Sequence, residues 1–379
     1  MIDTVVLTLM LDKFNITDHS RFSPSTLGLF NPPFYRLGGR GNFQCYQNPT
    51  ATELKEGNYK PRLTVIKRMV QGGFGIALRI EFSVPKLIYG NNFDEVTVAD
   101  FPQVVKTLHA KLTEMSVAVD IRDLVTAPVS AVHYSKNVIL TDYSTPKMVL
   151  DEIRKANVSL KLDANEANYR NDGHLLKYHT NTFELVFYDK IKDLAKAKQS
   201  EKRAVEKYNS IQLGLFDNLR ATRPFEVFRM ELRLGTRKTI TSELEAVGLS
   251  KDINFKELFS SVVSKAILLK HWQELTAYSP LSDQKPKSYS EYLTQVLQVN
   301  PKLKLNKAML FIGTKVVIDE VGLRNYRGII SKFGSKAWHR INKEFEKHSF
   351  PKKQLAVLPV VEKQLQEFKP VKMSAYKSV

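Results

Sequence analysis

The chain has 379 residues, of which 43% are hydrophobic and 10% aromatic, and its formal net charge is +18. This composition excludes a disordered chain, and the length allows two domains of roughly 100–200 residues each. The single cysteine, Cys45, excludes an intramolecular disulfide and a cysteine-based zinc site, which favours a reducing cytoplasm. The large positive charge predicts a polyanionic partner, most simply nucleic acid, over a basic surface that only keeps the chain in solution.

The first residues, MIDTVVLTLMLDKF, contain a short apolar run without a basic flank or a small-residue cleavage site. They predict a first strand at 5–11 and not a signal peptide. No apolar run reaches the ~20 residues that a membrane helix needs, so no membrane partner is expected. Residues 15–60 are rich in Pro, Gly, Asn and aromatic residues, which predicts a long loop with room for a β-hairpin.

Alternating apolar and polar residues predict a series of strands, and helical periodicity dominates from about residue 255. Strands are expected at 5–11, 62–69, 75–84, 117–124, 129–140, 183–190 and 226–237. Helices are expected at 100–112, 146–156, 191–210, 255–278, 288–299, 302–320, 321–333 and 335–347. The fold is therefore predicted to be α+β: a central antiparallel sheet with flanking helices in 1–245, a mainly helical domain in 250–350, and a basic irregular tail in 351–379.

One polar sheet face carries the residues of chemical interest. In each strand, alternation places polar side chains on a face that we expect to be open to solvent: Arg79, Glu81 and Ser83; His133 and Ser135; Glu184, Tyr188 and Lys190; Arg229, Glu231 and Arg233. Each has a plainer explanation, because a strand tyrosine usually packs, a lone histidine is usually structural, and Arg-x-Glu-x-Arg often forms a salt-bridge ladder.

Together these residues predict chemistry on a phosphodiester. Two carboxylates and an imidazole, Glu81, Glu231 and His133, are ligand types that suit Mg²⁺ or Mn²⁺. Such an ion polarises a phosphoryl oxygen, and the hydroxyl of Tyr188 then acts as a nucleophile with Lys190 nearby. Five basic residues are expected to contact DNA: Arg79, Lys136, Arg229, Arg233 and Arg237.

Residues 322–347 mix Arg and Lys with Tyr and Trp on short helices. This pattern is typical of a helix-turn-helix DNA reader, and ordinary amphipathic helices explain it equally well.

Four segments in order, MIDTVVL, RIEFSVPKLIYGNNF, FELVFYDKIKDL and VFRMELRLGTR, resemble the gene II/X family of phage and plasmid replication proteins. The resemblance covers roughly residues 1–250, and the chain is also similar to plasmid rolling-circle initiators, relatives of the HUH endonucleases. It implies an HUH/Rep-like sheet, with Tyr188 as nucleophile, Glu81 and Glu231 as active-site acids and His133 as a metal ligand. The chain departs from the pattern at His133, where the filamentous-phage member has Asp, and VSAVHYSKN contains no His-hydrophobic-His.

The resemblance implies a rolling-circle replication initiator, which nicks and rejoins one strand of origin DNA through a 5′-phosphotyrosine on Tyr188. Its DNA would be single-stranded or a hairpin, its partner a host helicase, and its location the cytoplasm of a bacterial host. The alternatives are a conjugative relaxase or transposase with the same chemistry, or a non-catalytic DNA-binding regulator. The chain contains no P-loop motif, which favours the smaller initiator over a relaxase.

Overall fold

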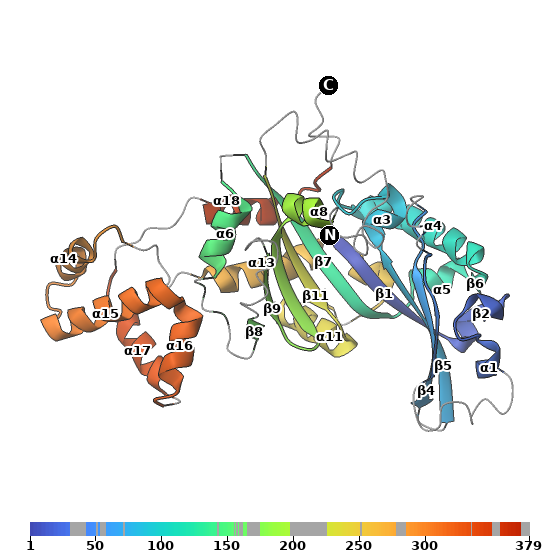
Figure 1. The fold of residues 1–379 in the computed structure, drawn as a ribbon, viewed down its shortest axis with the longest axis horizontal. Coiled ribbons are helices and arrows are strands. Elements are labelled where there is room, and N and C mark those ends of the chain that lie inside the picture. The colour runs from blue at the N-terminus through green and yellow to red at the C-terminus, as the bar shows by residue number, and fades with distance from the viewer. Residues whose placement is uncertain are drawn as a thin grey trace.

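A computed structural model gives the fold of the chain (Figure 1). It describes residues 1–30, 43–50, 52–53, 58–70, 73–141, 144–154, 156, 158, 162–164, 175–197, 226–250, 252–277, 286–334, 336–350 and 357–372. Over these residues the protein is α+β, with one large antiparallel sheet and helices packed against it, as the sequence predicts.

The sheet has nine strands in the order β3-β4-β5-β1-β7-β11-β10-β9-β8 within the described part of the chain. Their bounds are β1 Ile2–Met10, β3 Phe43–Gln47, β4 Arg62–Val70, β5 Gly73–Ser83, β7 Val129–Leu140, β8 Asp163–Ala164, β9 Leu175–His179, β10 Phe183–Asp189 and β11 Glu226–Leu234. A short pair, β2 Phe14–Ile16 and β6 Val117–Val119, lies beside it. The longer strands coincide with the predicted ones because their apolar residues alternate with a period of two.

Helices pack against the sheet. They are α3 Val84–Tyr89, α4 Phe101–Glu114, α5 Ile121–Val125, α6 Pro146–Ile153, α8 Lys190–Ala197, α11 Arg237–Ala246, α12 Phe255–Leu258, α13 Ser261–Thr276 and α18 Val357–Glu367; the short α1 spans Leu27–Phe30. The Trp272 ring of α13 lies edge-on to Phe228 of β11, and Phe228 stacks on Phe187 of β10. This apolar layer forces the other face of β10 and β11 to carry their polar residues.

A second, smaller core lies in α14 Tyr289–Val299, α15 Leu305–Val321, α16 Leu323–Ser331 and α17 Ala337–Glu346. These four helices form the group at the left of Figure 1. Helices α12 and α13 belong instead to the first core, since Phe255 and Trp272 are buried in it. The helical region that was expected to begin at 250 is therefore divided between two hydrophobic clusters.

Three local predictions are wrong. The strand expected at 117–124 ends at Val119, because Asp120 caps helix α5 by accepting a hydrogen bond from the Arg122 N–H. The tail expected to be irregular contains α18, whose Val361 and Leu365 are buried in the first core. The strand expected to reach residue 237 ends at Leu234, since the Thr236 side chain caps α11.

Helix α18 also completes one edge of the sheet. Strand β1 pairs with β7 only as far as Tyr134, which leaves the later residues of β7 with an open edge on that side. There the side-chain amide of Gln364 accepts a hydrogen bond from the Ile139 N–H and donates one to its carbonyl, at 2.9 and 2.7 Å. The amide replaces a missing strand, so the open edge of β7 does not remain unpaired.

The helix predicted at 191–210 begins as α8, and its part beyond residue 197 lies outside the described residues. Among the helices that the structure describes, none is both long enough and apolar enough to cross a bilayer.

Candidate functional site

Three central strands bring the predicted residues to one face. In the β10–β11 ladder Tyr188 lies opposite Arg229, and Val186 lies opposite Glu231. In the β11–β7 ladder Glu231 lies opposite Ser135, and Arg233 lies opposite His133. Directly opposed residues point to the same side of a sheet, so the phenol, the carboxylate, the imidazole and both guanidinium groups share a face.

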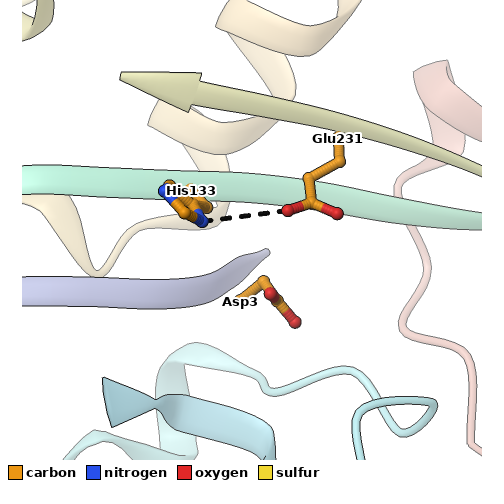
Figure 2. Close-up of side chains that lie close together, drawn as sticks. All are labelled: Asp3, His133 and Glu231. Atoms are coloured by element: carbon orange, nitrogen blue, oxygen red, sulfur yellow. Dashed lines mark ion pairs between the residues drawn. The ribbon is translucent and has the colours of Figure 1, made fainter. Parts of the chain in front are cut away.

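A cluster of metal-ligand type lies on this face. Asp3, His133 and Glu231 each offer one ligand atom, and these atoms all lie within 4.8 Å of one another (Figure 2). The carboxylate of Glu231 approaches Nδ1 of His133 to 3.8 Å. Carboxylate oxygens and an imidazole nitrogen are donors that Mn²⁺ and Mg²⁺ accept, so these residues fit such an ion chemically.

Asp3 was not among the predicted ligands. Strict alternation along β1 places Asp3 on the face opposite to Thr4, whereas the register of β1 against β7 shifts between Ile2 and Thr4. This irregularity turns both Asp3 and Thr4 towards the polar face, where the Thr4 hydroxyl donates to Asp3 at 3.1 Å. An ionisable residue inside the apolar run IDTVVLTLM is the signal that could have identified it.

Glu81 does not join the cluster. It lies on β5 opposite Val6 of β1 and Arg62 of β4, on the same face of the sheet as His133. Strands β5 and β7 are separated by β1, which corresponds to about 10 Å between their backbones. The third member of the cluster is therefore Asp3 and not Glu81.

Tyr188 is a buried hydrogen-bond donor. Its side chain is only 8% exposed, and its hydroxyl donates to Oε2 of Glu231 at 3.2 Å. Burial raises the pKa of Tyr188 well above its usual value, and the nearby Arg229 guanidinium offsets this only in part. The prediction that this face is open to solvent is wrong at its centre, because Tyr188, Arg229 and Glu231 are all buried.

Glu231 is held in its ionised form. Burial alone would raise the pKa of this carboxyl, but the charges of Arg233 and Arg229 outweigh it and hold the pKa well below its usual range. The Arg233 Nε donates to Oε1 at 2.9 Å. Burial also lowers the pKa of His133, which favours a neutral imidazole with a lone pair for a ligand.

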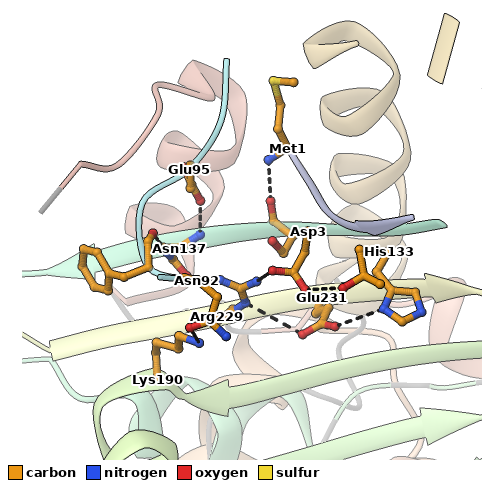
Figure 3. A network of polar contacts seen from close by, with 12 residues as sticks. Met1, Asp3, Asn92, Glu95, His133, Asn137, Lys190, Arg229 and Glu231 are labelled. Atoms are coloured by element: carbon orange, nitrogen blue, oxygen red, sulfur yellow. Dashed lines mark hydrogen bonds and ion pairs between the residues drawn. The ribbon is translucent and has the colours of Figure 1, made fainter. Parts of the chain in front are cut away.

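Arg229 is the centre of a buried polar network (Figure 3). Its guanidinium donates to Asp3 Oδ1 at 2.7 Å, to the Asn92 carbonyl at 3.0 Å and to Asn137 Oδ1 at 3.1 Å. The Asn92 side chain also accepts a hydrogen bond from Lys190 at 2.9 Å. Residues around position 92 thus lie over one end of the polar face and limit access to it.

Two of the predicted DNA contacts, Lys136 and Arg229, are already engaged in buried hydrogen bonds, and a third, Arg237, lies off the strand. Lys136 lies opposite Met230, on the apolar side of β7, and its buried ammonium donates to Glu95 Oε2 at 2.7 Å. Lys190, the first residue of α8, is also buried. Arg237 is exposed and begins helix α11 instead of extending β11. Lys136 and Lys190 are therefore not placed to meet a phosphate in this structure.

Arg79 and Arg233 are the predicted phosphate contacts that keep some exposure. Arg79 is half-exposed on β5, and Arg233 pairs with Glu184 at 3.1 Å as well as with Glu231. They lie on β5 and β11, with β1 and β7 between them.

Glu95 provides a pH-dependent contribution to stability. Burial would raise the pKa of its carboxyl, but the Lys136 ammonium and the Asn137 N–H, which donates at 2.6 Å, bring it below the ordinary value. A carboxyl with a depressed folded-state pKa stabilises the protein above its unfolded value of about 4.3, and this contribution disappears as the pH falls. We expect Glu95→Gln to lower the free energy of unfolding by about 2 kcal/mol at pH 7.

The difference between Glu95→Gln and the wild type should narrow below about pH 4, because there the carboxyl of the unfolded wild-type chain takes up a proton that the folded one does not. Urea unfolding at several pH values measures it. Glu274→Gln is the control because that carboxylate is 57% exposed. A difference that stays constant down to pH 3 would contradict the role of the Glu95 charge.

The structure thus defines an α+β protein with a partly buried, arginine-rich acid–imidazole–phenol cluster on one face of an antiparallel sheet. Comparisons with protein-family models, with curated proteins and with solved structures found no match.

Proposed function

We propose that this chain is a rolling-circle replication initiator of HUH-like fold, a metal-dependent endonuclease that nicks and rejoins single-stranded DNA. The observation that carries the proposal is the hydrogen bond from the Tyr188 hydroxyl to Glu231, beside Asp3 and His133. The net charge of +18 supports a DNA substrate. The resemblance of four segments to the gene II/X family supports the same reaction class.

In the proposed reaction the Tyr188 oxygen attacks the scissile phosphorus and its proton is released to water, while the hydrogen bond to Glu231 orients the hydroxyl. The bond between phosphorus and the 3′-oxygen breaks, and the leaving oxygen takes up a proton to become a 3′-hydroxyl. The 5′ end stays attached to the phenol, so a later attack by a 3′-hydroxyl reverses the step without ATP. Arg233 offsets charge on the phosphoryl oxygens.

Because Tyr188 is 8% exposed, the reaction requires that DNA binding uncovers the face. The segment around Asn92 is the part to move, since it contacts both Arg229 and Lys190.

A divalent ion would be held by Asp3, His133 and Glu231, and it would polarise the phosphoryl oxygens. Both carboxylates also hold an arginine in this structure, so the ion would share them with Arg229 and Arg233.

The ligand set can be tested by Mn²⁺ binding alone. We expect Asp3→Asn to weaken Mn²⁺ binding at least about tenfold, because it replaces a charged ligand by a neutral amide. Glu81→Gln should change it less than about threefold, since Glu81 lies two strands from His133. Calorimetric titration or the electron paramagnetic resonance signal of free Mn²⁺ measures both. If Glu81→Gln weakens Mn²⁺ binding more than Asp3→Asn does, Glu81 is the ligand and Asp3 is not.

A non-catalytic DNA-binding regulator is the second candidate, and one observation favours it. Arg229 and Glu231 are almost fully buried and, with Tyr188, bond mainly to one another and to neighbouring protein groups. A network of this kind also occurs where polar residues only stabilise a sheet.

Covalent attachment separates the two candidates. The protein is incubated with a pool of hairpin oligonucleotides that have randomised loops and a label at the 3′ end, with Mn²⁺, with Mg²⁺ and with chelator. The initiator gives a labelled band that survives denaturing electrophoresis in the presence of the ion, and peptide mapping places the DNA on Tyr188. Retarded mobility in a native gel without any covalent band would identify the regulator.

A further inference from the structure

The turn between α16 and α17 presents an aromatic side chain to solvent. Phe333 is 85% exposed, the highest value among the large hydrophobic side chains of the described residues. Fully burying a phenylalanine is worth roughly 1.5–3 kcal/mol, and this ring forgoes almost all of that gain. Ile329, one helical turn earlier on α16, is also exposed.

The backbone holds the ring at the tip of a rigid unit. The Phe333 N–H donates to the Ile330 carbonyl at 3.0 Å, and Gly334, with φ +150°, reverses the chain towards α17. Across the two helices the Arg327 guanidinium lies 5.2 Å from the centre of the Trp338 ring. The Arg327–Trp338 contact packs α16 against α17, and Phe333 lies just after the end of α16.

The charged residues near Phe333 in the sequence are all basic. Residues 321–343 contain six basic side chains and no acidic one. Lys332, Lys336 and Arg340, which border the turn, are exposed. An apolar ring within a purely cationic rim matches a nucleic-acid base with its phosphates, since each base offers a flat π-face beside negative charge.

We propose that the α16–α17 turn is a base-stacking site for single-stranded DNA, with Phe333 against a base and Lys332 and Lys336 on the flanking phosphates. The proposal rests on the proposed function for the identity of the polyanion. The stacking site would add a DNA contact outside the sheet, on the helices of the second core. Association with a protein through this turn is the alternative outcome, and it is measured below as a change in self-association.

The two kinds of contact have different signatures in binding. Stacking of a base on an aromatic ring depends little on salt, whereas each phosphate contact adds about 0.7 to the slope of log affinity against log salt for single strands. The test uses fluorescein-labelled oligothymidylate of about 20 nucleotides, longer than the ~4–16 nucleotides of one binding fold. Anisotropy is measured in chelator over a range of KCl, with all variants in the Tyr188→Phe background so that no DNA is cut.

We expect Phe333→Ala to weaken binding about tenfold with an unchanged salt slope, and Phe333→Tyr to restore it. Lys336→Gln should lower the slope by about 0.7. Val262→Ala, at a side chain 64% exposed on α13, is the matched control and should bind like the parent. If Phe333→Ala binds the oligonucleotide as tightly as the parent, the proposal is overturned. It is also overturned if Phe333→Ala changes only the self-association of the protein, which sedimentation measures.

The result of this binding test can be distinguished from the result of the test for DNA nicking. A chain that forms a phosphotyrosine while Phe333→Ala binds normally refutes the stacking site alone. A chain that forms no adduct while Phe333→Ala loses affinity leaves the stacking site standing.

Discussion

Tyr188→Phe is expected to lower the rate of covalent DNA attachment at least about 10³-fold, which corresponds to about 4 kcal/mol in the barrier. The phenylalanine keeps the ring but lacks the oxygen that would bond to phosphorus. In the folded protein the change removes one hydrogen bond to an ionised carboxylate, which is worth about 1.5–3 kcal/mol. The loss of activity should therefore exceed any loss of folded protein, and the labelled band in denaturing gels measures it.

Tyr134→Phe is the matched control for this variant. Tyr134 is also a buried strand tyrosine, but it lies on the apolar side of β7, where its hydroxyl donates to the Leu258 carbonyl at 3.2 Å. Both variants lose one buried hydroxyl, and only Tyr188 is next to Glu231. If the two variants attach DNA equally well, Tyr188 is not the nucleophile, and its hydroxyl serves only to satisfy Glu231.

The sequence predicts the strands well because alternation is a local property. Strands β5, β7, β10 and β11 lie where the pattern places them, and their pairing brings Tyr188, His133 and Glu231 to one face. The residue that completes the cluster, Asp3, escapes the pattern because an irregularity in β1 changes which way its side chain turns. Strict alternation has no means of predicting such a shift.

Burial of charged side chains depends on contacts between distant segments, and this is where prediction from sequence fails. Glu95, which pairs with Lys136, also accepts a hydrogen bond from the N–H of Val371, 276 positions further along the chain. Nothing in the sequence near Lys136 indicates that these distant residues bury it. A lysine in a strand of a basic protein therefore suggested a DNA contact, although its charge stabilises a buried carboxylate.

The same burial makes Arg229 the residue whose loss should destabilise the fold most. Arg229→Met keeps the aliphatic stem but leaves Asp3 and the buried Glu231 without their shared cation. Removing one partner of a buried ion pair costs about 3–5 kcal/mol, because the other charge remains desolvated. We expect a decrease of that size in the free energy of unfolding, measured by urea denaturation at neutral pH.

Arg122→Met provides the matched comparison for Arg229→Met, since Arg122 pairs with Asp120 at 3.1 Å while its side chain is 91% exposed. That variant should lose much less stability than Arg229→Met, because surface ion pairs contribute little. Adding Asp3→Asn to Arg229→Met should recover part of the loss, because it removes the carboxylate that loses its cation, whereas Glu231 keeps Arg233. Equal stability of the Arg229 and Arg122 variants would show that the network around Arg229 carries no more weight than a surface pair, and that the cluster is open to water.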